Sequence, residues 1–488
     1  MMISKKSLFV FHLIFMFFLA HAQEKQKPNI VFFLIDDLGW SDLGCYGSDY
    51  YDTPHIDKLA KKGMKFTAAY MAPTCAPSRA SLMTGEYPPG TGIYSVDAYA
   101  GTPLEMQKVK GIRSKESILP DDLTIAELLK EEGYTNGHFG KWHLGGNEET
   151  YPLAQGFDVN MGGCEAGSPK SFFSPFINIR NIEPQKEGAY LPDVLTNGAC
   201  DFIEENKNRA FFLYFPFYQV HVPLHAKKEW VEKYEGKHPY GGQSVPAYGA
   251  MVSYMDDCVG RVLDKLDELG LTENTVIFFV SDNGGQIVAT SNSPLRGQKG
   301  NLYEGGIRVP LIVKWPEMVT PGSVIDVPVS VVDFYPTLAE ITGANIPEDK
   351  LIDGESMVPL LTDKGVLKRE AIFWHLPSYN GNGLSNSSLW QTPGGAIRRG
   401  KWKLIEGFED GSLQLFNLES DIGETMNLSS QYPGMANELL EELKAWQKST
   451  NAPIPGEDNS QFEESSRDWI SRANTRNLKE TERLTVIR

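Results

Sequence analysis

The sequence is poor in the residues that staple small secreted domains, since five of its 488 residues are cysteine. This low count excludes a disulfide scaffold. Basic residues are also in deficit, because 46 lysines and arginines stand against 63 aspartates and glutamates and give a formal net charge of −17. Non-specific binding to DNA or RNA requires lysines and arginines that neutralise phosphates. We therefore predict no nucleic-acid partner.

Long apolar runs are missing after residue 22. Crossing a bilayer takes about 20 apolar residues, so no membrane span is predicted. The one long run, Leu8–Ala20, follows Lys5 and Lys6 and ends at the small-residue site Ala20-His21-Ala22. This order is typical of a signal peptide, so residues 1–22 are predicted to be removed during export to the periplasm or the medium. A membrane anchor is the alternative interpretation.

Internal repeats and low-complexity stretches are absent as well, and a hydrophobic content of 41% is ordinary for a globular protein. Apolar runs rich in β-branched and aromatic residues alternate with amphipathic helical patterns. The predicted strands are 29–35, 134–139, 211–217, 275–280 and 309–313, and the predicted helices are 122–132 and 248–269. Such alternation predicts an α/β fold with a doubly wound, mostly parallel sheet flanked by helices.

The pattern changes near residue 365. Four short strand candidates precede an amphipathic helix at 435–448: 371–374, 396–399, 401–405 and 413–417. These segments predict a smaller C-terminal α+β subdomain with an antiparallel sheet. We therefore divide the mature chain into a catalytic domain (23–365), this subdomain (366–450) and a polar tail (451–488). The tail is expected to wrap over the surface or to be partly mobile.

Oxygen-bearing side chains follow two of the predicted strands. Asp36 and Asp37 come directly after 29–35, and Asp282 and Asn283 come after 275–280. Ligands of open α/β sheets bind at the carboxyl ends of strands, and Ca²⁺ prefers several oxygen ligands. Each pair alone is also compatible with a helix cap or an Asn-Gly turn. Together they predict a shared cation site.

Basic and titratable side chains fall near the same predicted edge. Lys141 and His143 follow 134–139, His221 lies beyond 211–217, and Lys299 leads towards 309–313. Taken singly, each is also compatible with a solvated lysine or a half-buried, hydrogen-bonded histidine. With a bound cation, the set predicts a receptor for a compact anion inside an acidic protein.

Cys75 lies in the segment Pro73-Thr74-Cys75-Ala76-Pro77. Proline suits the first turn of a helix, so Cys75 is expected at or just before a helix N-terminus. The helix dipole at that place favours anions and a lowered thiol pKa. We therefore interpret Cys75 as a candidate nucleophile, with an inert small loop residue as the alternative.

At this point the sequence resembles a known family. Cys75-Ala76-Pro77-Ser78-Arg79, followed by Thr84-Gly85, resembles the signature of type I sulfatases, the formylglycine-dependent, arylsulfatase-like branch of the alkaline phosphatase superfamily. Gly133–His143 is similar to their second signature, except that Asn136 replaces the usual serine or threonine. The resemblance implies an alkaline-phosphatase-like fold and a sulfuric ester hydrolase. It also implies that a formylglycine-generating maturation enzyme converts Cys75 to formylglycine (3-oxoalanine).

The resemblance also implies a mechanism. Hydrated formylglycine carries two hydroxyls: one attacks sulfur and expels the alcohol, and loss of the proton from the other regenerates the aldehyde and releases sulfate. The implied Ca²⁺ ligands are Asp36, Asp37, Asp282, Asn283 and the modified residue 75. The other implied roles are: Arg79 and Lys141 hold the modified residue, Asp282 takes its proton, His143 is the base for collapse, and His221 and Lys299 contact the sulfate and protonate the leaving oxygen.

The substrate is predicted from the class of enzyme. An exported sulfatase suits a sulfated carbohydrate, with an algal polysaccharide such as ulvan or a carrageenan first and glycosaminoglycans next. Three segments are predicted to select the sugar: 94–113, 164–192 and 375–395. His375 and Arg398 are the candidate sugar contacts, with subdomain packing as the alternative.

Two other functions compete with the sulfatase interpretation. One is a phosphonate or phosphate ester hydrolase of the same superfamily, and the other is a non-catalytic protein that binds sulfated glycans. The complete set of basic residues favours a sulfate ester over a phosphonate or phosphate ester as the substrate. Because every expected catalytic residue type is present, we rank the non-catalytic binding protein last. Disulfide pairing stays open among Cys45, Cys164, Cys200 and Cys258, for which free thiols are equally compatible.

Overall fold

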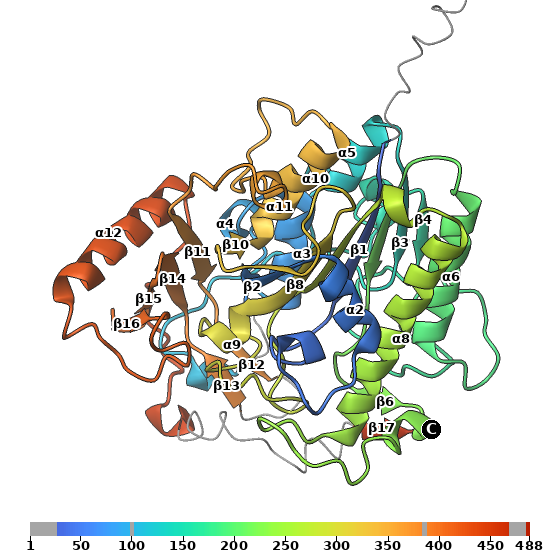
Figure 1. Ribbon diagram of the computed structural model, residues 1–488. Helices are drawn as coiled ribbons and strands as arrows, with labels where there is room; N and C mark the ends of the chain where they lie inside the picture. The colour runs from blue at the N-terminus through green and yellow to red at the C-terminus, as the bar shows by residue number, and fades with distance from the viewer. Residues whose placement is uncertain (1–26, 98–101, 383–387, 468–484) are drawn as a thin grey trace, which may run out of the picture.

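The computed structural model describes residues 27–97, 102–382, 388–467 and 485–488. The predicted signal peptide, residues 1–22, lies outside this part of the chain. A nine-stranded sheet forms the centre of the molecule (Figure 1). Its strands are β1 (Asn29–Ile35), β2 (Met64–Tyr70), β3 (Thr135–Phe139), β4 (Val159–Met161), β5 (Phe211–Pro216), β7 (Thr275–Ser281), β8 (Arg308–Lys314), β9 (Ser323–Ile325) and β10 (Val329–Ser330).

The strands follow the order β10-β2-β8-β7-β1-β5-β3-β4, with β9 paired to β2. β8 runs antiparallel to both β7 and β2, whereas the other pairings of this sheet are parallel. In the centre, Ile30 of β1 lies opposite Phe212 of β5 and Val276 of β7. The carboxyl ends of β1, β2, β3, β5 and β7 therefore share one edge with the amino end of β8. This arrangement confirms the mostly parallel α/β fold.

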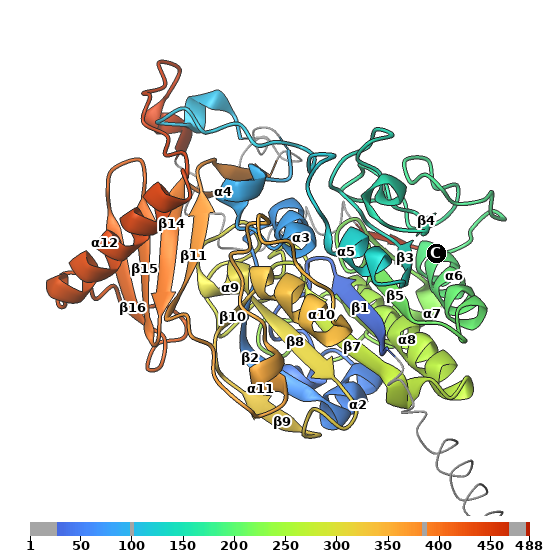
Figure 2. The ribbon, with the colours of Figure 1, turned by 90° about the horizontal axis from the view of Figure 1, so that it is seen from above.

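Helices cover both faces of the sheet, which explains the continuous apolar sequence of β1. Ile30, Phe32 and Leu34 pack on one face with α3 (Cys75–Thr84), α5 (Ile125–Glu131) and α10 (Phe334–Thr342). Val31, Phe33 and Ile35 pack on the other face with α2 (Pro54–Lys62), α6 (Leu191–Glu205) and α8 (Pro246–Glu268). Figure 2 shows these two helical layers on either side of the strands.

The two helices predicted in this domain are present. α5 begins with a capping box in which the Thr124 hydroxyl accepts from the Glu127 N–H and the Glu127 carboxylate accepts from the Thr124 N–H. Pro246 at the first position of α8 suits a helix start, because its missing N–H would have no partner there. Local sequence therefore determines where both helices begin.

A second sheet lies beside the first (left in Figure 1). It contains β11 (Ala371–Leu376), β14 (Gly394–Arg399), β15 (Trp402–Gly407) and β16 (Leu413–Asn417), all antiparallel and in this order. α12 (Pro433–Ser449) packs on one face through Ala436, Leu439 and Leu443. The other face packs against Tyr70, Leu302 and Ile307 of the larger unit. The predicted C-terminal α+β subdomain is confirmed, while the domain boundaries stay a prediction.

Shorter elements complete the fold. They are α4 (Pro88–Thr91), α7 (Lys228–Val231), α9 (Glu304–Ile307), α11 (Val358–Leu361), β6 (Leu224–Ala226), β12 (Asn380–Asn382), β13 (Ser388–Gln391), β17 (Thr485–Ile487), and the 3₁₀ turns η1 (Gly44–Tyr46), η2 (Leu104–Met106), η3 (Pro152–Gln155), η4 (Thr272–Asn274), η5 (Val331–Asp333) and η6 (Glu464–Arg467). In the part of the tail that the structure describes, residues 457–463 lie beside 104–110 and residues 485–488 lie beside 224–228 of the larger unit. Lys110 N–H donates to the Glu457 carbonyl at 2.7 Å, and β17 pairs with β6.

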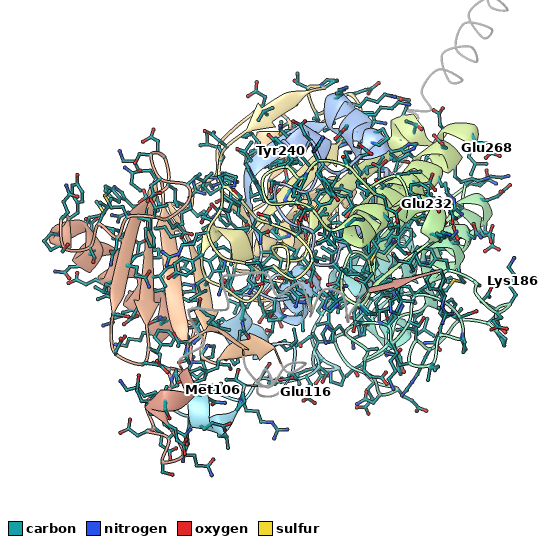
Figure 3. All side chains as sticks on the ribbon, turned by 90° about the horizontal axis from the view of Figure 1, so that it is seen from below. Met106, Glu116, Lys186, Glu232, Tyr240 and Glu268 are labelled. Carbon is teal, nitrogen blue, oxygen red and sulfur yellow. The ribbon has the colours of Figure 1, made fainter. Side chains whose placement is uncertain are left out.

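Charged side chains gather at the periphery of the molecule. Figure 3 shows Lys186, Glu232 and Glu268 projecting outward from the larger unit, and all three are exposed. Among the described residues, no helix combines the length and the apolar character that crossing a bilayer requires. All five cysteines are free thiols, so the structure contains none of the disulfides that the sequence left open.

Candidate active site

The oxygen-bearing residues predicted from the strand ends lie together at the carboxyl edge of the large sheet. Asp36 and Asp37 follow β1, and Asp282 and Asn283 follow its neighbour β7. The Asp37 N–H donates to Asp282 Oδ1 at 3.2 Å, and Asn283 Nδ2 donates to Asp37 Oδ1 at 2.8 Å. Asp37 adopts a left-handed backbone with φ 61°, a strained conformation that clusters at functional sites.

Two oxygen atoms in this group are buried without a hydrogen-bond partner, although Arg79 Nη2 lies 4.0 Å from Asp36 Oδ1. Among the described residues, neither Asp36 Oδ1 nor Asn283 Oδ1 has a hydrogen-bond donor. Ligand atoms of Asp36, Cys75 and Asp282 all lie within 4.8 Å of one another, and so do those of Asp36, Asp37 and His221. Unpaired buried oxygens are costly unless something binds them. The donor set therefore fits a hard cation such as Ca²⁺.

Burial and nearby charges act on the two carboxyls differently. Burial raises the pKa of Asp36 to about 8, even though Lys141 Nζ lies 2.8 Å from its Oδ2 atom. Burial also acts to raise the pKa of Asp37, but Lys299, whose Nζ lies 2.9 Å from its Oδ2 atom, outweighs burial together with His221, Lys141 and the Asn283 hydrogen bond, and the pKa falls to about 2. The charges of the protein thus favour the ionised form of Asp37, and a further positive charge would favour that of Asp36.

The basic residues converge on these carboxylates. Lys141 follows β3 after Gly140, whose φ of 130° and close approach to Pro216 admit no side chain: a Cβ there would lie 1.9 Å from the Pro216 carbonyl oxygen. Arg79, one turn along α3, donates from Nε (3.0 Å) and Nη2 (2.7 Å) to Asp282 Oδ2. Together with Lys299, these residues place three buried cations within one group of carboxylates.

His221 lies beyond β5, with Nε2 3.5 Å from Asp37 Oδ2. Its Nδ1 lies 2.6 Å from the Val222 carbonyl, to which it donates when protonated, leaving Nε2 facing the site. Burial, followed by the charge of Lys299, lowers the pKa of His221 to about 3. The imidazole is therefore neutral near pH 7.

Cys75 is the first residue of α3 and is 1% exposed. Its Sγ atom lies 3.5 Å from His143 Nδ1. The helix N-terminus was predicted correctly, but the lowered thiol pKa was not: burial raises the pKa of Cys75, and it outweighs the charges of Lys141 and Lys299. The unmodified thiol is consequently a poor nucleophile, because the thiolate is the reactive form.

Comparison with known proteins agrees with this geometry. The family model for sulfatases matches residues 28–344, more than half of the chain. This chain belongs to the sulfatase family. A second model, described as the C-terminal part of N-sulphoglucosamine sulphohydrolase, matches residues 298–449. The protein is therefore a sulfuric ester hydrolase.

Several relatives of this sulfatase cover most of its length. A protein named sulfatase from Formosa agariphila is 33% identical over 89% of this chain and 92% of its own. N-acetylgalactosamine-6-sulfatase of Rattus norvegicus is 34% identical over 76% of this chain and 72% of its own. Among solved structures, Ps i-CgsB in complex with k-i-k-neocarrahexaose has a TM-score of 0.73 at 30% identity and covers 94% of this chain and 99% of that one.

His143 of the sulfatase is held from two sides. Its backbone is left-handed, with φ 62°, and its N–H donates to the Cys164 carbonyl at 3.0 Å. Gly167 packs against the imidazole so closely that a Cβ there would lie 2.7 Å from Cε1 and 2.8 Å from Nε2. The segment from Cys164 to Gly167, inside one of the predicted sugar-selecting segments, therefore sets the orientation of His143.

This contact gives a prediction for Gly167→Ala. We expect the added methyl group to displace the imidazole and to lower kcat for sulfate ester hydrolysis by about 10²-fold, as a displacement of the order of 1 Å does in other active sites. Gly434→Ala is the matched control, because a Cβ at Gly434 meets nothing within 4 Å. Equal kcat values for the two variants would show that Gly167 does not position His143.

The two predicted sugar contacts have packing roles in the structure. His375 in β11 is 2% exposed, and its Nε2 lies 2.9 Å from the Pro453 carbonyl, the geometry of an N–H donor. Arg398 donates from Nε to the Gly400 carbonyl at 3.1 Å and from Nη1 to the Tyr70 hydroxyl. The packing interpretation explains both side chains, and their contacts with sugar stay predictions.

Sequence reasoning missed a buried ionic group between the two units of the sulfatase. Lys403 Nζ in β15 lies 2.9 Å from Glu304 Oε1 and 2.8 Å from Glu424 Oε1, and none of the three side chains is exposed. Glu424 Oε2 also accepts from the Glu304 N–H at 2.7 Å, at the start of α9. The group thus holds the segment that follows Lys299. Its sequence signal is a lysine between Trp402 and the apolar pair Leu404-Ile405.

Proposed function

We propose that this sulfatase removes sulfate from a sulfated carbohydrate, using formylglycine at position 75 and a bound Ca²⁺. The observation that carries the proposal is the convergence of Lys141, His143, His221 and Lys299 on the buried carboxylates around residue 75. A relative crystallised with k-i-k-neocarrahexaose and a relative named N-acetylgalactosamine-6-sulfatase support a carbohydrate substrate. A carrageenan-type oligosaccharide is our first choice and a glycosaminoglycan our second.

The cation would be held by Asp36, Asp37, Asp282 and Asn283, with residue 75 as a further ligand. The two unpartnered oxygens, Asp36 Oδ1 and Asn283 Oδ1, support this assignment. Bound Ca²⁺ would supply a Lewis acid that polarises a sulfate oxygen and keeps the carboxyls ionised. The chain's own contribution is to hold the carboxylates in place: Arg79 fixes Asp282, Lys141 fixes Asp36, and Lys299 fixes Asp37.

Formylglycine at position 75 would supply, in its hydrated form, one hydroxyl to attack sulfur and a second whose deprotonation releases sulfate. The surrounding side chains perform the proton transfers. Asp282 lies within 4.8 Å of residue 75 and is placed to take a proton from the attacking group. His143 Nδ1, 3.5 Å from the Cys75 sulfur, is placed to take the second proton.

Lys299 and His221 are placed on the Asp37 side of the site, where they would contact the sulfate. Both are rigidly held, Lys299 by Asp37 and His221 by the Val222 carbonyl. Preorganised positive charge in a buried site stabilises charge that develops in the transition state at little reorganisation cost. Lys299 would donate the proton that the leaving sugar oxygen needs, and His221 would do so once the bound sulfate anion favours its protonated form. The basic and apolar segment before residue 23 supports export of the enzyme.

The test of this function is sulfate release. Protein produced together with a formylglycine-generating enzyme should release inorganic sulfate from at least one of carrageenan, ulvan or glycosaminoglycan oligosaccharides, measured by ion chromatography. Aryl phosphate diesters and phosphonate esters serve as the comparison. A preference for the phosphorus esters, or binding of sulfated glycans without turnover by fully modified protein, would overturn the proposal.

Removal of calcium should destabilise the fold. A ligand that binds the native state alone, at 100 times its Kd, stabilises it by about 2.7 kcal/mol. We therefore expect a chelator to lower the melting temperature of the wild type and added Ca²⁺ to restore it, measured by differential scanning calorimetry. Asp36→Asn, which weakens the ligand set, should show a smaller response. A melting temperature that ignores both chelator and Ca²⁺ contradicts the assignment.

A further inference from the structure

A cavity of about 470 Å³ lies at the long loop that joins β7 to α9, and one of its lining residues, Gln298, directly precedes Lys299. The same loop begins with Asp282 and Asn283 and ends just after Lys299. The cavity is thus lined by the segment that connects two parts of the catalytic centre. Its lining includes Gly242, Ser291, Asn292, Ser293, Arg296 and Gln298.

Hydrogen bonds tie the cavity wall to the catalytic residues. Gln298 precedes Lys299 directly, and its side-chain oxygen accepts from the Ile287 N–H at 2.7 Å. The Lys299 N–H donates to the Gly285 carbonyl at 3.2 Å. Asn292 donates to the same carbonyl at 2.8 Å and accepts from the Gly285 N–H at 3.0 Å. A ligand in the cavity therefore lies on the same rigid loop that places Lys299.

The chemistry of the lining suits a sugar that carries an anion. Hydroxyl and amide side chains line the cavity together with the apolar Ile287, Pro294 and Leu295, and no carboxylate is among its lining residues. Arg296 is exposed yet held: its guanidinium carbon lies 4.0 Å from the centre of the Tyr303 ring, and Nη1 donates to the Glu424 carbonyl at 2.9 Å. A planar guanidinium fixed in this way, with donors remaining, recognises sulfate and carboxylate groups in a bidentate manner.

We propose that this cavity is a subsite for a neighbouring, anionic sugar unit of the same oligosaccharide, whose sulfate or carboxylate group binds Arg296. The inference rests on the proposed function, since it extends the substrate from one sulfated sugar to a chain with a second charge. The active site would then prefer oligosaccharides over single sugars. Arg296 acts in binding alone and takes no part in the chemistry.

The test separates the subsite from the catalytic centre. In a Cys75→Ala background, which binds without turnover, a carrageenan hexasaccharide and a chondroitin sulfate hexasaccharide are titrated by calorimetry. Inorganic sulfate serves as the probe of the centre, and its tighter binding event is the one compared, because the centre holds three buried cations and the cavity one exposed arginine. We expect Arg296→Ala to weaken hexasaccharide binding about tenfold, the scale of a lost hydrogen-bonded charge. The Kd for sulfate should stay unchanged.

Two further variants keep the test decisive. Ser293→Trp, at an exposed lining position, should fill the cavity and weaken hexasaccharide binding in the same way. Arg209→Ala makes the same charge change at an exposed residue just before β5, on the opposite edge of the sheet, and should change neither Kd. If Arg296→Ala weakens binding of the carrageenan hexasaccharide alone, the group that binds Arg296 is a sulfate. If it weakens binding of the chondroitin sulfate hexasaccharide alone, the group is a uronate.

The subsite is overturned if Arg296→Ala and Ser293→Trp leave hexasaccharide binding unchanged, if they weaken sulfate equally, or if neither hexasaccharide binds. The proposed function fails separately. It fails if fully modified wild type releases no sulfate from any sulfate ester, including p-nitrophenyl sulfate, which is too small to occupy the cavity and the centre together.

Discussion

Cys75→Ala is expected to lower kcat for sulfate ester hydrolysis by about 10⁴-fold or more, the scale on which enzymes lose activity with their covalent nucleophile. The structure supports this size of effect. Cys75 begins α3 at the point where the Asp36, Asp282 and His143 side chains meet, so no neighbouring side chain can replace it. The measurement is kcat for the substrate that the wild type desulfates best.

Two other substitutions make the result specific to residue 75. Cys75→Ser keeps one hydroxyl but lacks the second, so it should release at most one equivalent of desulfated sugar per enzyme and no free sulfate. Cys200→Ala changes a partly buried thiol on α6 and should leave kcat unchanged. Turnover by Cys75→Ala, or an unmodified residue 75 in the peptide mass spectrum of fully active enzyme, would contradict the formylglycine mechanism.

Lys403→Met is expected to lower the free energy of unfolding by about 3–5 kcal/mol, the usual cost of removing one partner from a buried ion pair. The lysine is fully buried between Glu304 and Glu424. Burial acts to raise the pKa of Glu304, yet Lys403, followed by Arg308 and Arg398, outweighs burial and the pKa falls to about 2. Without the lysine, Glu304 retains Arg308 at 3.1 Å, whereas Glu424 loses the cation that lies 2.8 Å from its Oε1 atom. Urea unfolding at pH 7, followed by tryptophan fluorescence, measures the loss.

The control for this prediction is a lysine two positions away. Lys401, about half exposed and 3.6 Å from Glu419, forms a surface pair, so Lys401→Met should cost less than about 1 kcal/mol. Adding Glu424→Gln to Lys403→Met removes one of the two acids and should recover part of the stability. Equal stability of the two lysine variants would show that the buried group contributes little to joining the two units.

Much of the fold could be predicted because local sequence patterns indicate its strands and helices. β1 is apolar from Ile30 to Ile35 since helices cover both its faces, and α5 begins at the Thr124 capping box. The short C-terminal strands were recognisable from their spacing. β2 was not predicted, because its mixed sequence MKFTAAY shows no clear apolar run. Its place in the sheet nevertheless determines where α3, and with it Cys75, begins.

The candidate site, like the fold, was predicted in part from the sequence. Motifs at residues 36–37, 75–79, 141–143 and 282–283 named its members, and the structure brings them together. The lowered pKa predicted for Cys75 was wrong because the helix dipole was considered without the burial that opposes it. The packing of His375 depends on Pro453, a contact between residues 78 positions apart, which no local pattern reveals.

The sequence by itself determined the chemistry. The residue types that bind a cation and an anion follow the predicted strands or lie in short motifs, and both are recognisable without knowledge of the fold. The tertiary structure alone decided where these side chains lie relative to one another. Lys299 precedes β8, and in a wholly parallel sheet it would lie on the far edge. Because β8 runs antiparallel between β2 and β7, its amino end meets their carboxyl ends and brings Lys299 to within 2.9 Å of Asp37.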